Sequence, residues 1–284
     1  MNVTNEIVNR ERRSMKMKRM MQLTMVLAIA LMATIATGAS AAEDATELMK
    51  KSHLAYYYAG DDGLAEVDMR IVDKKGKERI RNFTMLRLDN EQGGDQKYYT
   101  YFKKPSDVAR MTFMVHKNSE GNDLRWIYVP AVDLVKPISA DDKNSSFVGS
   151  DFSYEDVSGR HWSEDTHTIV GDSTWDGAAV YIVESKPKEE YDGFAVKRSY
   201  INKESLLPHK ELYFDEDGEL IKIMTAEEIK EVDGIATIVH RTMEDVDKER
   251  VTHVIFSDIE YNVGIENDLF TERFLKNPPM QYIR

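Results

Sequence analysis

One segment of the chain gathers the side chains best suited to chemistry. Ser150, Asp151, Glu155 and Asp156 lie close together, and His161 follows them. Paired carboxylates can hydrolyse glycosidic bonds when they are held at the right separation. A serine with a histidine and an aspartate can act as a nucleophile. In a segment rich in Ser and Asp the same residues cap helices and form turns. The pattern therefore favours a structural role, and a hydrolase built on Ser150, Asp151 and His161 stays open as an alternative.

The remaining reactive groups form no recognisable constellation. The chain has no cysteine, and we find no Gly-rich phosphate loop, no G-x-S-x-G elbow and no H-E-x-x-H motif. His209, His240 and His253 lie on separate predicted strands, and the sequence does not show whether they converge. Most histidines on strands are surface or core residues rather than metal ligands. We therefore predict no catalytic residue, no metal and no cofactor.

The N-terminal region has the three parts of a secretory signal peptide. Basic residues between Arg12 and Arg19 precede the apolar run Leu23–Ala36, and small residues follow at 38–42. The apolar run is shorter than the roughly 20 residues that span a bilayer as a helix. We predict that this region is a cleaved leader and that the protein is exported to the periplasm.

The cleavage site divides the chain into a leader and one domain. We expect cleavage after Ala41, with Ala42 as the alternative, and translation beginning at Met15 or Met17. A lipoprotein precursor needs a cysteine at this site, so the absence of cysteine argues against a lipid anchor. No repeat or long linker follows, and residues 42–284 are expected to form a single domain.

The charge of the chain narrows the class of partner. The formal net charge is −12, and removal of the basic leader makes it more negative. A nucleic-acid surface needs clustered basic charge, and adhesion to anionic lipids needs it as well. We therefore predict no nucleic-acid partner, and we interpret the acidity as keeping an exported protein soluble.

From residue 64 onward the hydrophobic pattern has a period of two, which is typical of β-strands. A helix is predicted over residues 44–58 and another over 267–275, while 139–163 reads as an ordered loop or short helix across the sheet. About a dozen short antiparallel strands with tight turns favour a barrel or a strongly curved sheet. The strand candidates cover residues 64–71, 79–88, 97–102, 110–116, 124–129, 132–138, 166–170, 178–184, 195–202, 210–215, 220–229, 235–246 and 249–261.

Several predicted strands are apolar on both faces, among them residues 98–102, 111–115 and 126–129. A sheet with one wet face would show clean alternation. Two explanations stay open: helices cover the outer face, or the concave side is an apolar cavity. Methionines such as Met85 and Met111 suit a site that adapts to variable apolar ligands, but they also fill ordinary cores.

Three motifs resemble a family of outer-membrane lipoprotein-sorting proteins. They are Tyr101–Asp107, followed by Phe113; the strand Trp126–Ala131; and Ser146-Phe147-Val148-Gly149-Ser150-Asp151-Phe152-Ser153-Tyr154-Glu155-Asp156. The resemblance extends over essentially the whole mature chain. Ala109-Arg110 stands where the family pattern has a glycine, so the local turn is expected to differ.

The resemblance implies a fold similar to that of the lipoprotein carrier LolA and its acceptor LolB. That fold is mainly β (α+β): an incomplete, strongly curved antiparallel β-barrel whose open side is covered by short helices. An apolar cavity lies between them. The expected cavity walls are Met85, Phe102, Met111, Phe113, Trp126 and Tyr128. The expected lid or loop residues are Phe147, Gly149, Ser150, Asp151, Phe152 and Tyr154.

The function implied by the resemblance is a shuttle for the acyl chains of lipoproteins or phospholipids toward the outer membrane. Members of the family are often found with inner-membrane transporters of the resistance-nodulation-division (RND) type, so such a transporter is the expected protein partner. The alternative is a non-carrier subunit that docks onto an envelope transporter and regulates it. The sequence leaves the cargo, the direction of transport and the oligomeric state open.

Overall fold

The computed structural model describes residues 44–283. The predicted signal peptide, residues 1–41, lies outside them. The part of the chain from Thr46 onward forms one compact unit, and the chain is helical over residues 44–57. Within 44–283 no helix has both the length and the apolarity to cross a membrane.

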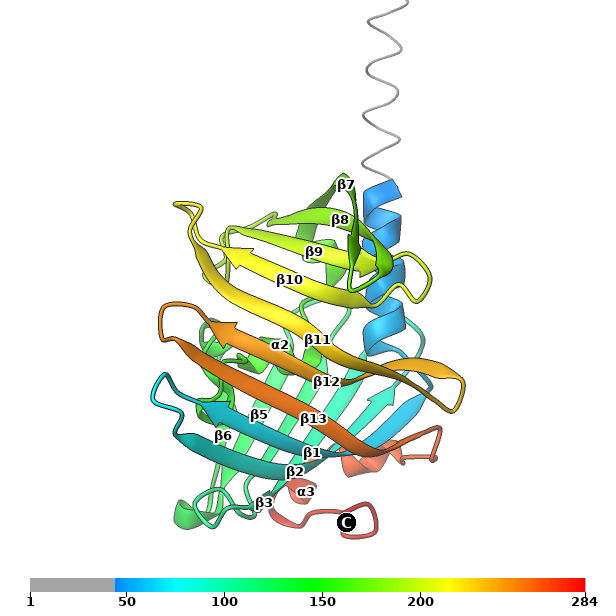
Figure 1. Ribbon diagram of the computed structural model, residues 1–284. Helices are drawn as coiled ribbons and strands as arrows, with labels where there is room; N and C mark the ends of the chain where they lie inside the picture. The colour runs from blue at the N-terminus through cyan, green and yellow to red at the C-terminus, as the bar shows by residue number, and fades with distance from the viewer. Residues whose placement is uncertain (1–43, 284) are drawn as a thin grey trace, which may run out of the picture. The chain divides into compact units, whose positions relative to one another are not determined.

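The unit is built on a single antiparallel sheet of 13 strands, strongly curved and not closed into a barrel (Figure 1). This confirms the predicted fold class. The strands are β1 (Asp62–Val72), β2 (Glu78–Asp89), β3 (Gln96–Lys104), β4 (Thr112–Lys117), β5 (Leu124–Val129), β6 (Leu134–Ile138), β7 (Asp165–Trp175), β8 (Ala178–Pro187), β9 (Val196–Asn202), β10 (Pro208–Phe214), β11 (Leu220–Val232), β12 (Ile235–Asp245) and β13 (Arg250–Tyr261).

The sheet consists of two meanders, β1–β6 and β7–β13, in which each strand pairs with its neighbour in sequence. The pairing of β1 with β13 joins the two meanders, and β6 and β7 are the edge strands. The chain passes from one edge to the other through residues 139–164, which we call the crossing segment. It contains the 3₁₀ turns Ala140–Asp142, Phe147–Gly149 and Trp162–Glu164 and the short helix α2 (Tyr154–Ser158). In Figure 1, α2 lies behind β12, on the concave side of the sheet.

The predicted strands agree with the structure, with differences at some ends. The sixth strand begins at Leu134 rather than at 132, because Pro130–Val132 form a 3₁₀ turn that ends in a left-handed Asp133. The predicted C-terminal helix is split into Asn267–Leu269 and α3 (Glu272–Lys276), since the backbone of Phe270 is not helical. Arg110 has φ +68° at the place where the family pattern has a glycine. The turn there uses the backbone conformation that glycine favours, although the residue is an arginine.

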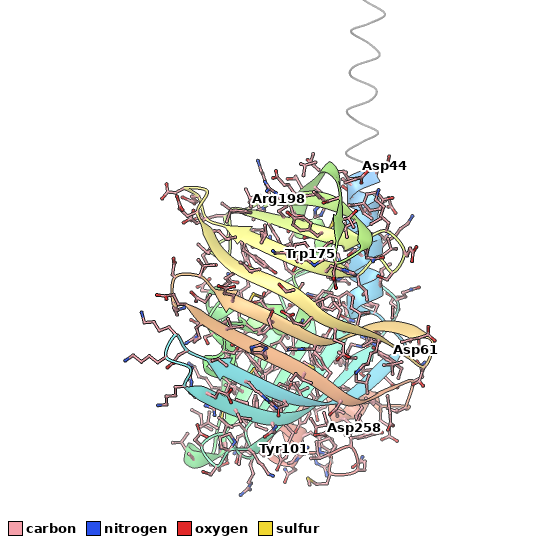
Figure 2. All side chains as sticks on the ribbon, in the orientation of Figure 1. Asp44, Asp61, Tyr101, Trp175, Arg198 and Asp258 are labelled. Carbon is pink, nitrogen blue, oxygen red and sulfur yellow. The ribbon has the colours of Figure 1, made fainter. Side chains whose placement is uncertain are left out.

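Apolar side chains are buried on both faces of the first meander, and a different part of the chain covers each face. The concave face carries Met69, Phe83 and Phe113, which pack against Phe147 and Phe152 of the crossing segment. The convex face of β1–β5 packs against residues 263–282, the C-terminal segment. Figure 2 marks Tyr101 at the end of the sheet that this segment covers.

The C-terminal segment is anchored by hydrogen bonds as well as by apolar contacts. The carboxylate of Asp62 accepts the backbone N–H groups of Val263, Gly264 and Ile265 at 2.7, 2.8 and 2.9 Å. Further along, the Tyr99 hydroxyl donates to the carbonyl oxygen of Phe274 at 2.7 Å. The C-terminal segment therefore covers the outer, convex face of these strands. This is the role that the first explanation for strands with two apolar faces gave to helices.

Candidate ligand cavity

A cavity of about 150 Å³, here the main cavity, lies between the end of the N-terminal helix and the concave face of the sheet. Its walls are predominantly apolar. They come from the helix end, the start of β1, the middle of β2 and the facing parts of β12 and β13. The residues used below are Tyr56, Met85, Val157, Arg241 and Phe256. An apolar space of this size accepts a group about as large as benzene.

A second space of about 20 Å³, the inner cavity, lies deeper under the crossing segment. Phe83, Phe147 and Phe152 line it. The two cavities share four wall residues: Met85, Val157, Arg241 and Phe256. The main cavity therefore continues toward the crossing segment. The side chains of this segment that point into the fold, Phe147 and Phe152, limit its extent there.

Phe147 is the central inserted side chain. It is 2% exposed, and its ring centroid lies 5.2 to 6.3 Å from those of Phe83, Phe102, Phe113 and Tyr154. Several of these contacts are edge-to-face, an arrangement that aromatic rings prefer. Phe147 thus fills the region that an acyl chain would occupy if it extended from the main cavity into the fold.

Polar contacts fix the crossing segment to the sheet. Oδ1 of Asp151 accepts a hydrogen bond of 2.6 Å from Arg250 Nε, and Oδ2 accepts one of 2.6 Å from the Thr252 hydroxyl. A capping box of Ser153 and Asp156 begins α2. These bonds explain how a Ser/Asp-rich loop stays ordered inside the curve of the sheet.

Gly149 has φ +81°, and a Cβ there would lie 3.2 Å from Nη1 of Arg79. The Arg79 guanidinium donates to the Gly149 carbonyl oxygen at 3.0 Å. Glycine therefore meets both a backbone requirement and a close approach at this point.

The N-terminal helix closes the other side of the main cavity. Leu48 and Met49 pack against Val183 and Ile201 of the second meander, as Figure 1 shows where the helix runs beside β8–β10. At the end of the helix, the guanidinium of Arg87 in β2 donates to the carbonyl oxygens of residues 57, 59 and 60. The helix thus bridges the two meanders across the open side of the sheet.

The structure separates the residues predicted as cavity walls into two groups. Met85 lines both cavities. Phe102 and Phe113 are fully buried in the concave core around Phe147, and Met111 packs at the edge of that core. Trp126 and Tyr128 belong to the core on the convex face, under the C-terminal segment. Adjacent residues of a strand point to opposite faces, so Ile127, between them, faces the concave side.

The residues considered for a hydrolase bond to other partners. The Ser150 hydroxyl donates to the Phe152 carbonyl oxygen at 3.2 Å, and the Asp151 carboxylate is taken up by Arg250 and Thr252. Nδ1 of His161 lies 2.6 Å from the Ser163 hydroxyl. Ser150, Asp151 and His161 therefore do not form a catalytic triad in this arrangement.

Two of the three strand histidines do converge. His240 Nε2 and His253 Nδ1 lie 3.3 Å apart on β12 and β13, while His209 is the second residue of β10. In the described range 44–283, no group of three or more His, Asp or Glu side chains is arranged to hold a metal ion.

Most residues that line the main cavity were not predicted from the sequence, and Arg241 and Tyr56 are among them. Arg241 occupies an inward position of β12, and its Nη1 donates to the Tyr56 hydroxyl. Its guanidinium lies 4.9 Å from the ring centroid of Phe152 and 5.7 Å from that of Phe256. One feature of the sequence could have identified Arg241: it lies two residues before Met243 on the same strand, so both side chains point to the concave face.

A family model and several solved structures are similar to this chain. A family model described as an uncharacterized protein matches residues 94–277. The crystal structure of a DUF1329 family protein from Desulfovibrio piger is 26% identical, with a TM-score of 0.77, and the match covers 83% of this chain and 99% of that one. A domain from Vibrio parahaemolyticus named for outer-membrane lipoprotein sorting gives the same four values. No curated protein sequence matches.

A more distant structure shares the fold. The LolA superfamily protein NE2245 from Nitrosomonas europaea is 15% identical, with a TM-score of 0.62, and the match covers 80% of this chain and 96% of that one. The resemblance to lipoprotein-sorting proteins that the three sequence motifs predicted is thereby confirmed.

Proposed function

Because the chain belongs to the DUF1329 family and has a LolA-like fold, we propose that it is a periplasmic carrier of acyl chains. In this proposal the main cavity holds part of a lipid or lipoprotein tail during transfer toward the outer membrane. An RND-type transporter of the inner membrane supplies or receives the cargo. The apolar cavity between the N-terminal helix and the sheet is the observation that carries the proposal.

Physical chemistry requires a container for such cargo. Each exposed CH₂ group costs about 0.8 kcal/mol in water, so a long tail crosses the periplasm only if apolar walls surround it. Met85 and Phe256 provide such walls in both cavities. The closed form accepts a group the size of benzene, and a whole chain requires Phe147 to leave its place among the rings that surround it.

The crossing segment is the element proposed to move. Its inserted rings, Phe147 and Phe152, line the inner cavity, and a few polar bonds hold it to β2 and β13. Loops that cover binding sites are drawn from the less stable parts of a fold. Displacement of Phe147 would join the two cavities into a longer apolar channel.

Native mass spectrometry of protein purified without detergent tests the proposal. We expect co-purifying lipid with the wild type and its loss in Met85→Trp, which fills the main cavity. Met114→Trp is the matched control, because Met114 is 1% exposed and belongs to the convex core. Lipid should remain bound to that variant. A wild-type protein that is always empty but binds an envelope transporter tightly would instead identify an accessory subunit.

A further inference from the structure

Arg241 is a cationic side chain placed among rings, at the junction of the two cavities. Rings of Tyr56, Phe152 and Phe256 lie within 6 Å of its guanidinium. These cation–π contacts offset part of the cost of taking a charge out of water. Its Nε is buried and has no hydrogen-bond partner.

No carboxylate forms an ion pair with Arg241 anywhere in residues 44–283. Its only side-chain hydrogen bond goes to the Tyr56 hydroxyl. Burial raises the pKa of Tyr56, so that hydroxyl stays neutral and supplies no charge. Asp156 acts on Arg241 from beyond ion-pair distance, and its Oδ2 is occupied by the Ser153 N–H at 2.7 Å.

The other well-buried arginines are different. Each has a carboxylate within 3.5 Å, in the pairs Arg81–Asp107, Arg87–Asp89, Arg125–Asp123, Arg160–Asp165 and Arg250–Asp151. Arg87 also reaches the main cavity, but its guanidinium donates to helix carbonyls and lies beside Asp89. Among the described residues, Arg241 is therefore the cation on the cavity wall that has no carboxylate within ion-pair distance.

We propose that Arg241 binds the anionic head group of the cargo, a carboxylate or a phosphate on a hydrocarbon tail. This inference rests on the proposed carrier function and names the chemical class of its ligand. A guanidinium donates paired hydrogen bonds that match carboxylate and phosphate geometry. In a cavity with little water such a bond is stronger than at the surface.

The position of Arg241 also fixes how such a ligand would lie. The head group sits at the junction of the cavities, beside the Tyr56 hydroxyl, which can donate a second hydrogen bond. The tail follows apolar walls on either side, past Met85. The ligand is then an anion whose head group lies at Arg241 and whose hydrocarbon tail lies along the apolar walls.

Three probes of equal chain length test the inference: dodecanoate, dodecyl phosphate and the neutral dodecanol. Each competes with N-phenyl-1-naphthylamine, a neutral fluorescent apolar dye, for protein purified without detergent at pH 7.5. We expect the wild type to bind at least one anion about tenfold or more tightly than dodecanol, as a charge-assisted hydrogen bond implies. Preference for dodecanoate assigns a carboxylate head group, and preference for dodecyl phosphate assigns a phosphate.

Three variants complete the test. Arg241→Met should lower the affinity for the anion to that for dodecanol and leave dodecanol binding unchanged. Arg241→Lys keeps the charge and should keep part of the preference. Arg198→Met removes the same charge from β9, where Arg198 pairs with Glu184 on the outer face (Figure 2), and should behave as the wild type.

The outcomes separate the two proposals. Equal binding of the three probes by the wild type, or an anion preference that survives in Arg241→Met, overturns the role of Arg241 while the carrier stands. If neither the dye nor any probe binds the wild type, the carrier proposal falls and this inference falls with it.

Discussion

The Nε atom of Arg250 in β13 lies 2.6 Å from Oδ1 of Asp151 in the crossing segment. The side chain of Asp151 is fully buried. Asp151 also accepts a hydrogen bond from the Thr252 hydroxyl. A strand that joins the two meanders is thus tied directly to the segment that carries Phe147 and Phe152. Whether the cavity can open depends on these bonds.

Asp151→Asn should loosen the crossing segment. Removing one partner of a buried ion pair leaves the other uncompensated and costs about 3–5 kcal/mol in the free energy of unfolding. We expect lower stability in urea and faster amide hydrogen exchange over residues 139–158. Asp68→Asn is the control, since it breaks an exposed pair with Arg70, worth about 0–1 kcal/mol. Equal exchange in both variants would contradict the anchoring role of Asp151.

Phe147→Ala should enlarge the inner cavity. Loss of a buried phenylalanine costs about 3–5 kcal/mol, and the vacated space adjoins the main cavity, so the affinity for long-chain amphiphiles should rise. Phe270→Ala is the matched control, because Phe270 is 1% exposed and packs on the convex face. It should lose similar stability in urea without gaining affinity. A similar gain by both variants would show that Phe147 does not plug the cavity.

Gly159→Ala should destabilise the contact between α2 and the N-terminal helix. Gly159 has φ +77°, and an added Cβ would lie 2.4 Å from Cζ of Tyr57. Gly177→Ala places the same side chain at φ +79° with nothing within 4 Å. Both variants strain a backbone with positive φ, which costs about 1–3 kcal/mol at each site. Thermal unfolding should show a distinctly larger loss for Gly159→Ala, and equal losses would refute the steric argument.

The stability of the protein should fall as the pH is lowered from about 6.5 toward 4. Burial, and then the charge of Lys117, lower the pKa of His161 from 6.5 to about 4. Over this interval the unfolded chain binds a proton that the folded chain does not, so protonation favours unfolding. Unfolding in urea at several pH values measures the slope, and His161→Gln should reduce it. An unchanged slope in the variant would exclude His161 as a source.

Arg241→Met should leave the melting temperature of the ligand-free protein unchanged or raise it. The variant removes a cation that has no carboxylate partner and keeps a long apolar side chain. Differential scanning calorimetry of the ligand-free wild type and variant measures both melting temperatures. A melting temperature lower by several degrees would mean that the contacts with Tyr56 and Phe152 outweigh the desolvation cost, and that the arginine serves the fold itself.

The strands were predicted well from the sequence because each meander is a series of hairpins. Where apolar and polar residues alternate along a strand, this alternation stops at residues typical of turns. β5 was predicted at the observed bounds, Leu124–Val129. The number of short strands and their tight turns indicated a barrel or a strongly curved sheet, and the family motifs then implied an incomplete barrel. The crossing segment was also recognised, from aromatic residues in a stretch otherwise typical of a loop.

The sequence could not distinguish the two faces of a strand that is buried on both. Trp126 and Phe113 look equivalent in the sequence, yet Trp126 packs near the C-terminal segment and Phe113 against Phe147. The partners lie 34 positions away for Phe113 (147 − 113) and more than a hundred positions away for Trp126, and no local pattern reveals them. Arg241 was missed for a related reason: a charged residue in a strand normally marks a solvated face.

The strand order also bears on how the chain reaches its native state. Eleven of the twelve ladders join sequence neighbours, and only that between β1 and β13 brings distant parts of the chain together. Local hairpins form quickly, while a long-range pairing must first overcome the entropy of closing a large loop. The walls of the main cavity come from β1 and β2 of one meander and from β12 and β13 of the other, so the cavity exists only where β13 is paired with β1.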